Sequence, residues 1–168
     1  MKKLLLGLLA LGLTTQFYAQ VIEDGMLPEV EVRATNYKYL NSVDNSEAAV
    51  PVQLLQKKAA QFDIKSAEFY EDSSDFYRVY FFIPDGTIVA AYDRDGQILY
   101  TIEKFENVAL PNTVTDAIGE KFPGWKISKD VYRVNYTQKK GALQRYKVVL
   151  DNGVKKIRVK VDEKGVFL

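Results

Sequence analysis

Residues 75–105 read DFYRVYFFIPDGTIVAAYDRDGQILYTIEKF, and this stretch decides the fold. It holds three runs with strand-like alternation, Phe76–Ile83, Thr87–Tyr92 and Gln97–Phe105, separated by segments that contain Asp-Gly. An Asp-Gly pair between such runs is a strong hairpin signal, because glycine readily takes the positive φ that a type I′ turn requires. The stretch therefore predicts an antiparallel meander.

A second, weaker series of strand patterns closes the chain. Its runs are Tyr132–Tyr136, Arg145–Leu150, Val154–Val161 and Val166–Leu168. A further strand-like run, Ile64–Glu71, precedes the first meander. The chain thus contains four strand patterns in each half, which suggests one unit used twice.

A helical pattern precedes each group of strands. One apolar stripe follows Pro51 and the other follows Pro111, and proline is common in the first turn of a helix. The stripes are Val52, Leu55, Ala59, Phe62 and Val114, Ala117, Ile118, Phe122. We therefore expect an α+β fold of two tandem αββββ units, residues 49–108 and 109–168, with both helices on one face of an antiparallel sheet of eight strands.

Residues 1–19 have the features of a secretory signal peptide. Lys2 and Lys3 precede the apolar run Leu4–Leu13, and Ala19 offers a cleavage point. The apolar run is about half of the roughly 20 residues that a spanning helix needs, so we expect no membrane span in the exported chain. The chain contains no Cys, and a lipid-modified form is therefore not expected. The predicted location is the periplasm or the exterior of the cell.

Residues 20–48 differ in pattern from the rest of the chain and are interpreted as an N-terminal arm. Val30 and Val32 alternate with Glu29, Glu31 and Arg33, which indicates one short strand. That strand either lies on the body of the protein or adds to the sheet edge of another protein.

Composition argues against several chemistries. The chain has no His and no Cys, so the commonest general base, the commonest transition-metal ligands and the thiol nucleophile are missing. Asp93–Gly96 resembles the start of a calcium loop but lacks the later ligands, and a hairpin turn explains it better. The 23 cations and 22 acids of the chain nearly balance, which argues against nucleic acid as a partner. We expect no catalytic activity and no cofactor.

The outward face of the second unit is predicted to be basic. Alternation sends Tyr132, Val134 and Tyr136 inward together with the apolar residues of the later strands. The residues between them carry six cations: Arg133, Arg145, Lys147, Lys156, Arg158 and Lys160. Such a face attracts an anionic partner, or it only keeps an exposed sheet soluble and unpaired.

The outward face of the first unit is predicted to be aromatic. Tyr77, Val79, Phe81 and Ile83 serve the core, which leaves their neighbours outside. The outward group is expected to contain Phe76, Arg78, Tyr80 and Phe82, with Tyr92 and Tyr100 on adjoining strands. An exposed aromatic face is typical of a protein interface. The alternative is that Tyr37, Tyr39 and Leu40 of the arm cover it.

Several of these segments together resemble the PepSY-like proteins of Bacteroidetes, which are also described as similar to β-lactamase-inhibitor-type (BLIP-like) domains. The resemblance covers 50–168. It is carried by Tyr92–Leu99, Ala109–Pro111, Ala117-Ile118, Phe122–Trp125, Tyr146–Val148, Asn152-Gly153 and Val161–Gly165. It implies an exported, non-enzymatic module and transfers no functional residue.

These expectations lead to one functional hypothesis with an alternative. The first is an exported binding module that engages an envelope or extracellular protein through its open sheet face. The residues predicted to bind are Tyr80, Phe82, Tyr92, Tyr100, Arg133, Lys156, Arg158 and Lys160. The alternative is a periplasmic carrier of a small ligand or glycan, which would show a closed apolar pocket instead. An enzyme is the third hypothesis.

Overall fold

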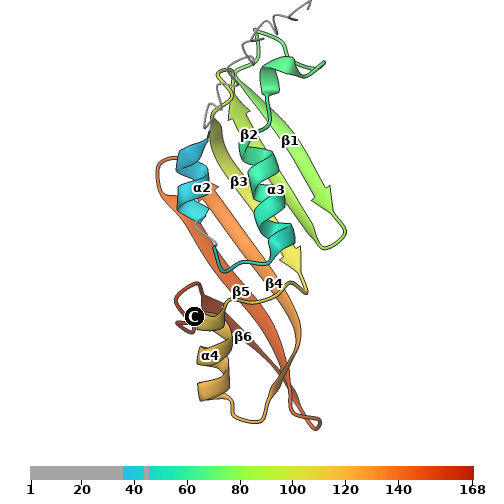
Figure 1. The fold of residues 1–168 in the computed structure, drawn as a ribbon, viewed down its shortest axis with the longest axis vertical. Coiled ribbons are helices and arrows are strands. Elements are labelled where there is room, and N and C mark those ends of the chain that lie inside the picture. Colours follow the sequence, from blue (N-terminus) through green and yellow to red (C-terminus); the bar gives the residue numbers. More distant parts are fainter. Residues whose placement is uncertain (1–35, 44–45) are drawn as a thin grey trace, which may run out of the picture. The chain divides into compact units, whose positions relative to one another are not determined.

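A computed structural model describes residues 36–43 and 46–168. Their strands form one antiparallel sheet of six strands in the order of the chain (Figure 1). The strands are β1 (Phe76–Ile83), β2 (Gly86–Asp93), β3 (Ile98–Glu106), β4 (Lys126–Thr137), β5 (Gly141–Asp151) and β6 (Lys156–Asp162). The predicted mixed α+β class and the antiparallel meander are confirmed.

The helices lie on one face of this sheet, as expected (Figure 1). They are α2 (Tyr37–Val43), α3 (Val50–Ala60) and α4 (Asn112–Lys121). Both longer helices begin beside the prolines that the sequence indicated, with Pro51 inside the first turn of α3 and Pro111 directly before α4. Val52, Leu55 and Ala59 of α3 and Val114 and Ile118 of α4 enter the core.

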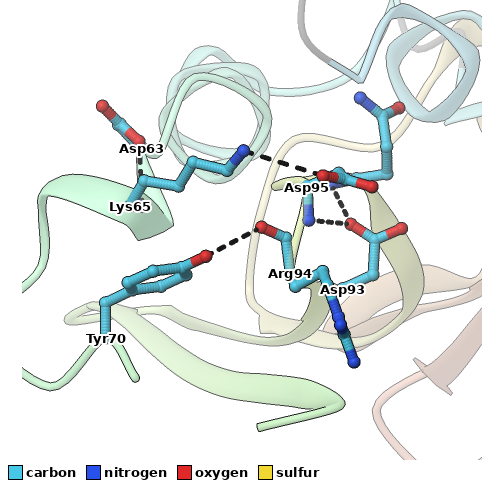
Figure 2. Close-up of polar contacts among 7 residues, drawn as sticks. Asp63, Lys65, Tyr70, Asp93, Arg94 and Asp95 are labelled. Carbon is cyan, nitrogen blue, oxygen red and sulfur yellow. Dashed lines mark hydrogen bonds and ion pairs between the residues drawn. The ribbon is translucent and has the colours of Figure 1, made fainter. Parts of the chain in front are cut away.

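The expectation of eight strands is wrong, and the reason begins at Ile64–Glu71. This segment forms the 3-10 helix η1 (Ile64–Ser66) and turns instead of a strand. The Asp63 carboxylate caps η1 by accepting from the backbone N–H of Lys65 at 3.0 Å. Figure 2 shows how the segment is held against the β2–β3 turn: Lys65 Nζ lies 3.6 Å from Asp95 Oδ1, and Tyr70 donates to the Arg94 carbonyl at 3.4 Å. Local capping and these contacts together override the strand-like pattern.

The fourth strand of the second half is reduced to a single bridge, between Val161 and Phe167. The turn that leads to it repeats the β2–β3 turn. Asp93 Oδ1 accepts from the N–H groups two and four residues later, at 2.9 and 2.8 Å (Figure 2). Asp162 Oδ1 does the same, at 2.9 Å for both. Gly96 and Gly165 take φ +80° in the two turns, so both use the same Asp-x-x-Gly geometry.

The first hairpin differs from the prediction in its turn. Its turn residues are Pro84 and Asp85, and Gly86 belongs to β2, opposite Ile83. A type I′ turn cannot form there because the proline ring holds φ negative. Gly86 is required for another reason: a Cβ atom at this position would come within 2.2 Å of the buried Phe105 ring. The glycine therefore makes room for the core.

The core between helices and sheet contains the inward residues that alternation predicts. They include Tyr77 and Phe81 of β1, Tyr132, Val134 and Tyr136 of β4, and Tyr146, Val148 and Leu150 of β5, all of them buried. Ile118 is buried as expected, at 2% exposure. Phe62, Phe122 and Val159, which the same patterns predict to be buried, are half-buried and pack against the core.

The start of α2 is tied to two distant parts of the chain. The Asn36 side chain donates to the carbonyls of Ala60 and Gly96, at 3.1 and 3.0 Å, and accepts from the N–H of Ile98 at 2.6 Å. Residues 37–43 of the expected arm thus form a helix. The expected strand near Val30 and the expected signal peptide lie outside the described residues. Within the described ranges no helix has the length and apolarity to cross a membrane.

Candidate functional site

The face of the sheet opposite the helices is the candidate site. Among the described residues, α2, α3 and α4 all pack on the other face. Pairing across the ladder aligns the outward side chains in rows that run over several strands. One row joins Tyr80, Val89, Ile102, Asn135 and Leu143, and the next joins Phe82, Thr87, Lys104, Arg133 and Arg145.

Large apolar side chains on this face are solvent-exposed. We call Phe76, Tyr80, Phe82, Ile102 and Leu143 the apolar patch; their exposed fractions are 52, 52, 68, 55 and 48%. The Tyr80 and Phe82 rings are stacked, with centroids 6.3 Å apart and planes 10° from parallel. Single exposed apolar residues are normal, whereas several large ones on one open sheet face mark a candidate interaction surface.

Tyr100 lies at the border of the patch and is half-buried. Its hydroxyl accepts from Arg78 Nη2 at 3.2 Å. The two residues face each other across Ala91 of β2, and this alanine is fully covered. The Arg78–Tyr100 pair therefore flanks the small side chain at one end of the patch.

The prediction that Tyr92 belongs to this surface is wrong. Tyr92 is opposite Tyr77 in the ladder, on the helix-covered face, and is 0% exposed. Its hydroxyl donates to the Ala59 carbonyl at 2.6 Å. Alternation from Ile88 through Ala90 already sends Tyr92 inward, and burial raises its pKa well above the ordinary tyrosine value.

The basic strip lies beside the apolar patch. We give this name to Arg133, Arg145, Lys147, Lys156, Arg158 and Lys160, all of which are exposed as expected. Lys156 pairs with Asp151 at 3.1 Å; within the part of the chain that the structure describes, the other five make no ion pair.

Like charges are direct neighbours in the strip. Arg145 is opposite Arg133, which is in turn opposite Lys104, and Lys147 is opposite Lys160. Lys104 is neutralised by an ion pair with Glu106. Arg145 also has Asp162 opposite it on β6, and Lys156 has Asp151. Like charges directly opposite in a sheet are destabilising, so the Arg133–Arg145 and Lys147–Lys160 pairs cost stability that an anionic partner would restore.

Residues 36–43 do not cover the apolar patch. Tyr39 is buried on the helix side, where its ring meets that of Tyr136 edge to face at 5.2 Å and its hydroxyl donates to Glu103 at 2.8 Å. Leu40 packs against the same core and Tyr37 is exposed. This part of the expected arm therefore leaves the outward aromatics accessible.

A buried carboxylate lies on the helix side, where no function was predicted. Glu103 of β3 is 1% exposed. One of its oxygens accepts from Tyr39 at 2.8 Å and from Thr101 at 2.7 Å, and the other accepts from Gln56 at 2.7 Å. Burial raises its pKa, although these three donors act in the opposite direction. Glu103 thereby fixes α2 and α3 on β3.

Glu103 is expected to make stability depend on pH. Because its pKa is higher in the folded chain, the folded state holds more protons between the ordinary and the raised value, and stability falls as pH rises through this window. Glu103→Gln retains the shape and removes the titration. Denaturant unfolding from pH 4 to 7 should show the wild type losing stability relative to this variant as pH rises.

Glu106, on the same strand, provides a control because its pKa is shifted in the opposite direction. Its hydrogen bond and ion pair with Lys104 lower the pKa of its carboxyl group. Relative to Glu106→Gln, the wild type should therefore lose stability as pH falls through the lowered pKa. A Glu103→Gln difference that does not change with pH would contradict the assigned shift.

The hollows of the described surface are open. One of about 230 Å³ lies between the α2–α3 connection and α4 and is lined by Glu47, Gln144, Tyr146 and Glu163 among others. A second of about 280 Å³ lies between α3 and the end of β1, lined mainly by Val50, Leu54, Phe82 and Ile83. In the described ranges, no three acidic side chains come close enough to hold a metal ion.

Three residues that matter here were not predicted from the sequence. Ile102 and Leu143 belong to the apolar patch, and Glu103 belongs to the buried network. The sequence does contain a signal for two of them. Alternation within β3 sends Ile102 to the outward face and puts Glu103 on the inward face, together with Thr101 and Phe105. Leu143 lies just before the strand that the sequence indicated at Arg145, so its face was undefined.

Comparison of the chain with protein-family models, with curated proteins and with solved structures gives no match.

Proposed function

We propose that this protein is an exported, non-enzymatic binding module that engages a protein partner through the open face of its sheet. The observation that carries the proposal is the apolar patch bordered by the basic strip on a face that the described helices leave open. Aromatic side chains supply large contact area, and neighbouring cations orient a partner of opposite charge.

The partner that fits this face is a protein surface or segment with apolar side chains next to acidic ones. The Tyr80–Leu143 row would contact the apolar side chains, and the adjacent row with Arg133 and Arg145 would pair with the acidic ones. Acidic side chains of the partner would reduce the repulsion between the opposed cations, and this reduction would add to the free energy of binding.

A carrier of a small ligand or glycan is the second candidate. Its best support is the apolar hollow between α3 and β1, which includes Leu54 and Phe82. This hollow is open, whereas ligand sites enclose most of the ligand surface. The broad outward face therefore supports a protein partner better.

The PepSY-like and BLIP-like assignment and the descent from two αββββ units belong to the same proposal. The repeated Asp-x-x-Gly turns support it, because they align β2 with β6 and β3 with the short segment at Phe167. On this alignment each unit has one reduced strand: η1 occupies the place of the first, and the Val161–Phe167 bridge that of the last.

Charge removal tests the role of the basic strip. Replacing Arg133, Lys156, Arg158 and Lys160 together by serine should weaken capture of the native partner from envelope fractions. The loss should be larger at low salt, because added salt screens charges beyond about 10 Å at 0.1 M. The melting temperature should stay near that of the wild type, since these side chains are exposed.

The matched control removes four cations elsewhere. Lys57 and Lys58 of α3, Lys121 of α4 and Lys139 after β4 are also exposed, and none belongs to the strip. Their replacement by serine changes the net charge equally and should leave capture intact. Equal capture by both quadruple variants would show that the strip only keeps the sheet soluble.

A further inference from the structure

The two edges of the sheet differ in how they are protected. In the described sheet, β1 and β6 each have a neighbour on one side only. The outward residues of β6 are Lys156, Arg158 and Lys160, and its end is covered by the chain terminus, where the Leu168 N–H donates to the Lys160 carbonyl at 3.0 Å. Charges and a covering segment protect an edge against strand pairing.

Among the described residues, the β1 edge has almost no such protection. Over Phe76–Ile83 its only charged side chain is Arg78, and five of its eight residues are aromatic. In a hairpin closed by two residues, the pair that flanks the turn is hydrogen-bonded, here Ile83 and Gly86. Hydrogen-bonded pairs then alternate along the ladder, so the backbone groups of Phe76, Arg78, Tyr80 and Phe82 point away from β2.

We propose that the β1 edge pairs with the β1 edge of a second copy of this chain, antiparallel and around a two-fold axis at Val79. This register aligns Phe76 with Phe82 of the second copy, Tyr77 with Phe81, Arg78 with Tyr80, and Val79 with Val79. The N–H and C=O groups that point away from β2 in each copy can then form hydrogen bonds with those of the other copy. The two six-stranded sheets would join into one continuous sheet.

The strand is complementary to itself in this register. Each opposed pair joins two aromatic rings, an arginine and a tyrosine, or two valines, which are the pairs that stabilise antiparallel neighbours. Moving the axis to Arg78 would oppose two arginines, and like charges there are unfavourable. Moving it to Tyr80 would oppose Arg78 to Phe82, whose ring has no hydroxyl to accept from the guanidinium, and would lose both Arg78–Tyr80 pairs.

The same residues on both copies form the contact, as two-fold symmetry requires. The pairing does not depend on the proposed partner, because it uses the backbone edge of β1 and leaves the basic strip free. It has a consequence for that function, however: Tyr80 and Phe82 of both copies would lie on one continuous outward surface.

A cysteine at position 79 tests the contact directly, because the chain has no cysteine of its own. In the proposed register the two Val79 residues form a non-hydrogen-bonded pair, with Cα atoms about 4.5 Å apart, which a disulfide can span. The Val79→Cys protein, oxidised with glutathione disulfide, should become a covalent dimer. Thr87→Cys, on the outward face of β2, should stay monomeric under the same conditions.

Sedimentation equilibrium of the protein without cysteine supplies the second measurement. The wild type should reach the mass of two chains as concentration rises. Arg78→Glu should raise the dissociation constant about tenfold or more, because the symmetry removes two Arg78–Tyr80 pairs at once. Arg158→Glu on the β6 edge should have no effect.

A wild type that is monomeric at all concentrations, together with a Val79→Cys protein that forms no more dimer than Thr87→Cys, would overturn the proposal. A dimer that Arg78→Glu leaves unchanged, and in which Val79→Cys does not cross-link, would also overturn it. If either result occurred and the basic-strip variant still lost capture of the partner, the dimer would be refuted and the proposed function would stand. The two proposals can therefore fail independently.

Discussion

Replacing Ile118 by alanine is expected to lower the free energy of unfolding by about 2–5 kcal/mol, the range for large-to-small changes in a core. Ile118 is 2% exposed and joins α4 to the same core as α3 and the inward strand residues. Truncation leaves a cavity that the surrounding side chains fill only in part. Urea unfolding followed by circular dichroism measures the loss.

Asp116 on the same helix supplies the control. Its side chain is exposed, and Asp116→Ala should change stability by no more than about 0.5 kcal/mol, as for other surface positions. If Ile118→Ala stayed within this surface range as well, α4 would not share a core with the rest of the chain, and the packing of this helix on the sheet would be incorrect.

Truncation of the most exposed aromatics is expected to have the largest effect on partner binding. Tyr80→Ala and Phe82→Ala should each weaken binding by about 2 kcal/mol or more if they are anchors of the interface. Their melting temperatures should change little, because both side chains are more than half exposed. Tyr100→Ala should have a smaller effect on binding, since Tyr100 is half-buried beside Arg78.

Tyr92→Ala separates binding from stability. Tyr92 is fully buried, and its truncation should cost about 3–5 kcal/mol of folding free energy, as for other large aromatics. The fraction that remains folded should bind as the wild type does. Titrations and thermal melts of the four tyrosine and phenylalanine variants decide the matter: normal binding by both Tyr80→Ala and Phe82→Ala would remove the apolar patch from the proposed site.

Local patterns were sufficient for much of the fold. Period-two alternation assigned the faces of β1 and of β4 to β6, because neighbouring side chains of a strand must point to opposite faces. The stripes after Pro51 and Pro111 identified α3 and α4, because apolar residues at helical spacing share one face of a helix. The exposed positions of Tyr80, Phe82, Arg133 and the lysines of β6 followed directly, and so did the burial of Ile118.

Only the tertiary structure decided the remainder. The strand-like run Ile64–Glu71 is compatible with a strand, but the Asp63 cap makes its start the 3-10 helix η1. The contacts of Lys65 and Tyr70 with the β2–β3 turn hold the segment in place. Gly86 resembles a turn glycine, yet it is the Phe105 ring, 19 residues later in the sequence, that leaves no room for a Cβ there.

The same holds for the candidate site. Alternation can place Tyr100 outward and Tyr92 inward, but it cannot say which rows of different strands align, because register depends on turn geometry and on packing against the helices. The apolar patch and the opposed cations exist only through that register. The sequence by itself therefore determined the elements and their faces, and long-range contacts decided which side chains became neighbours.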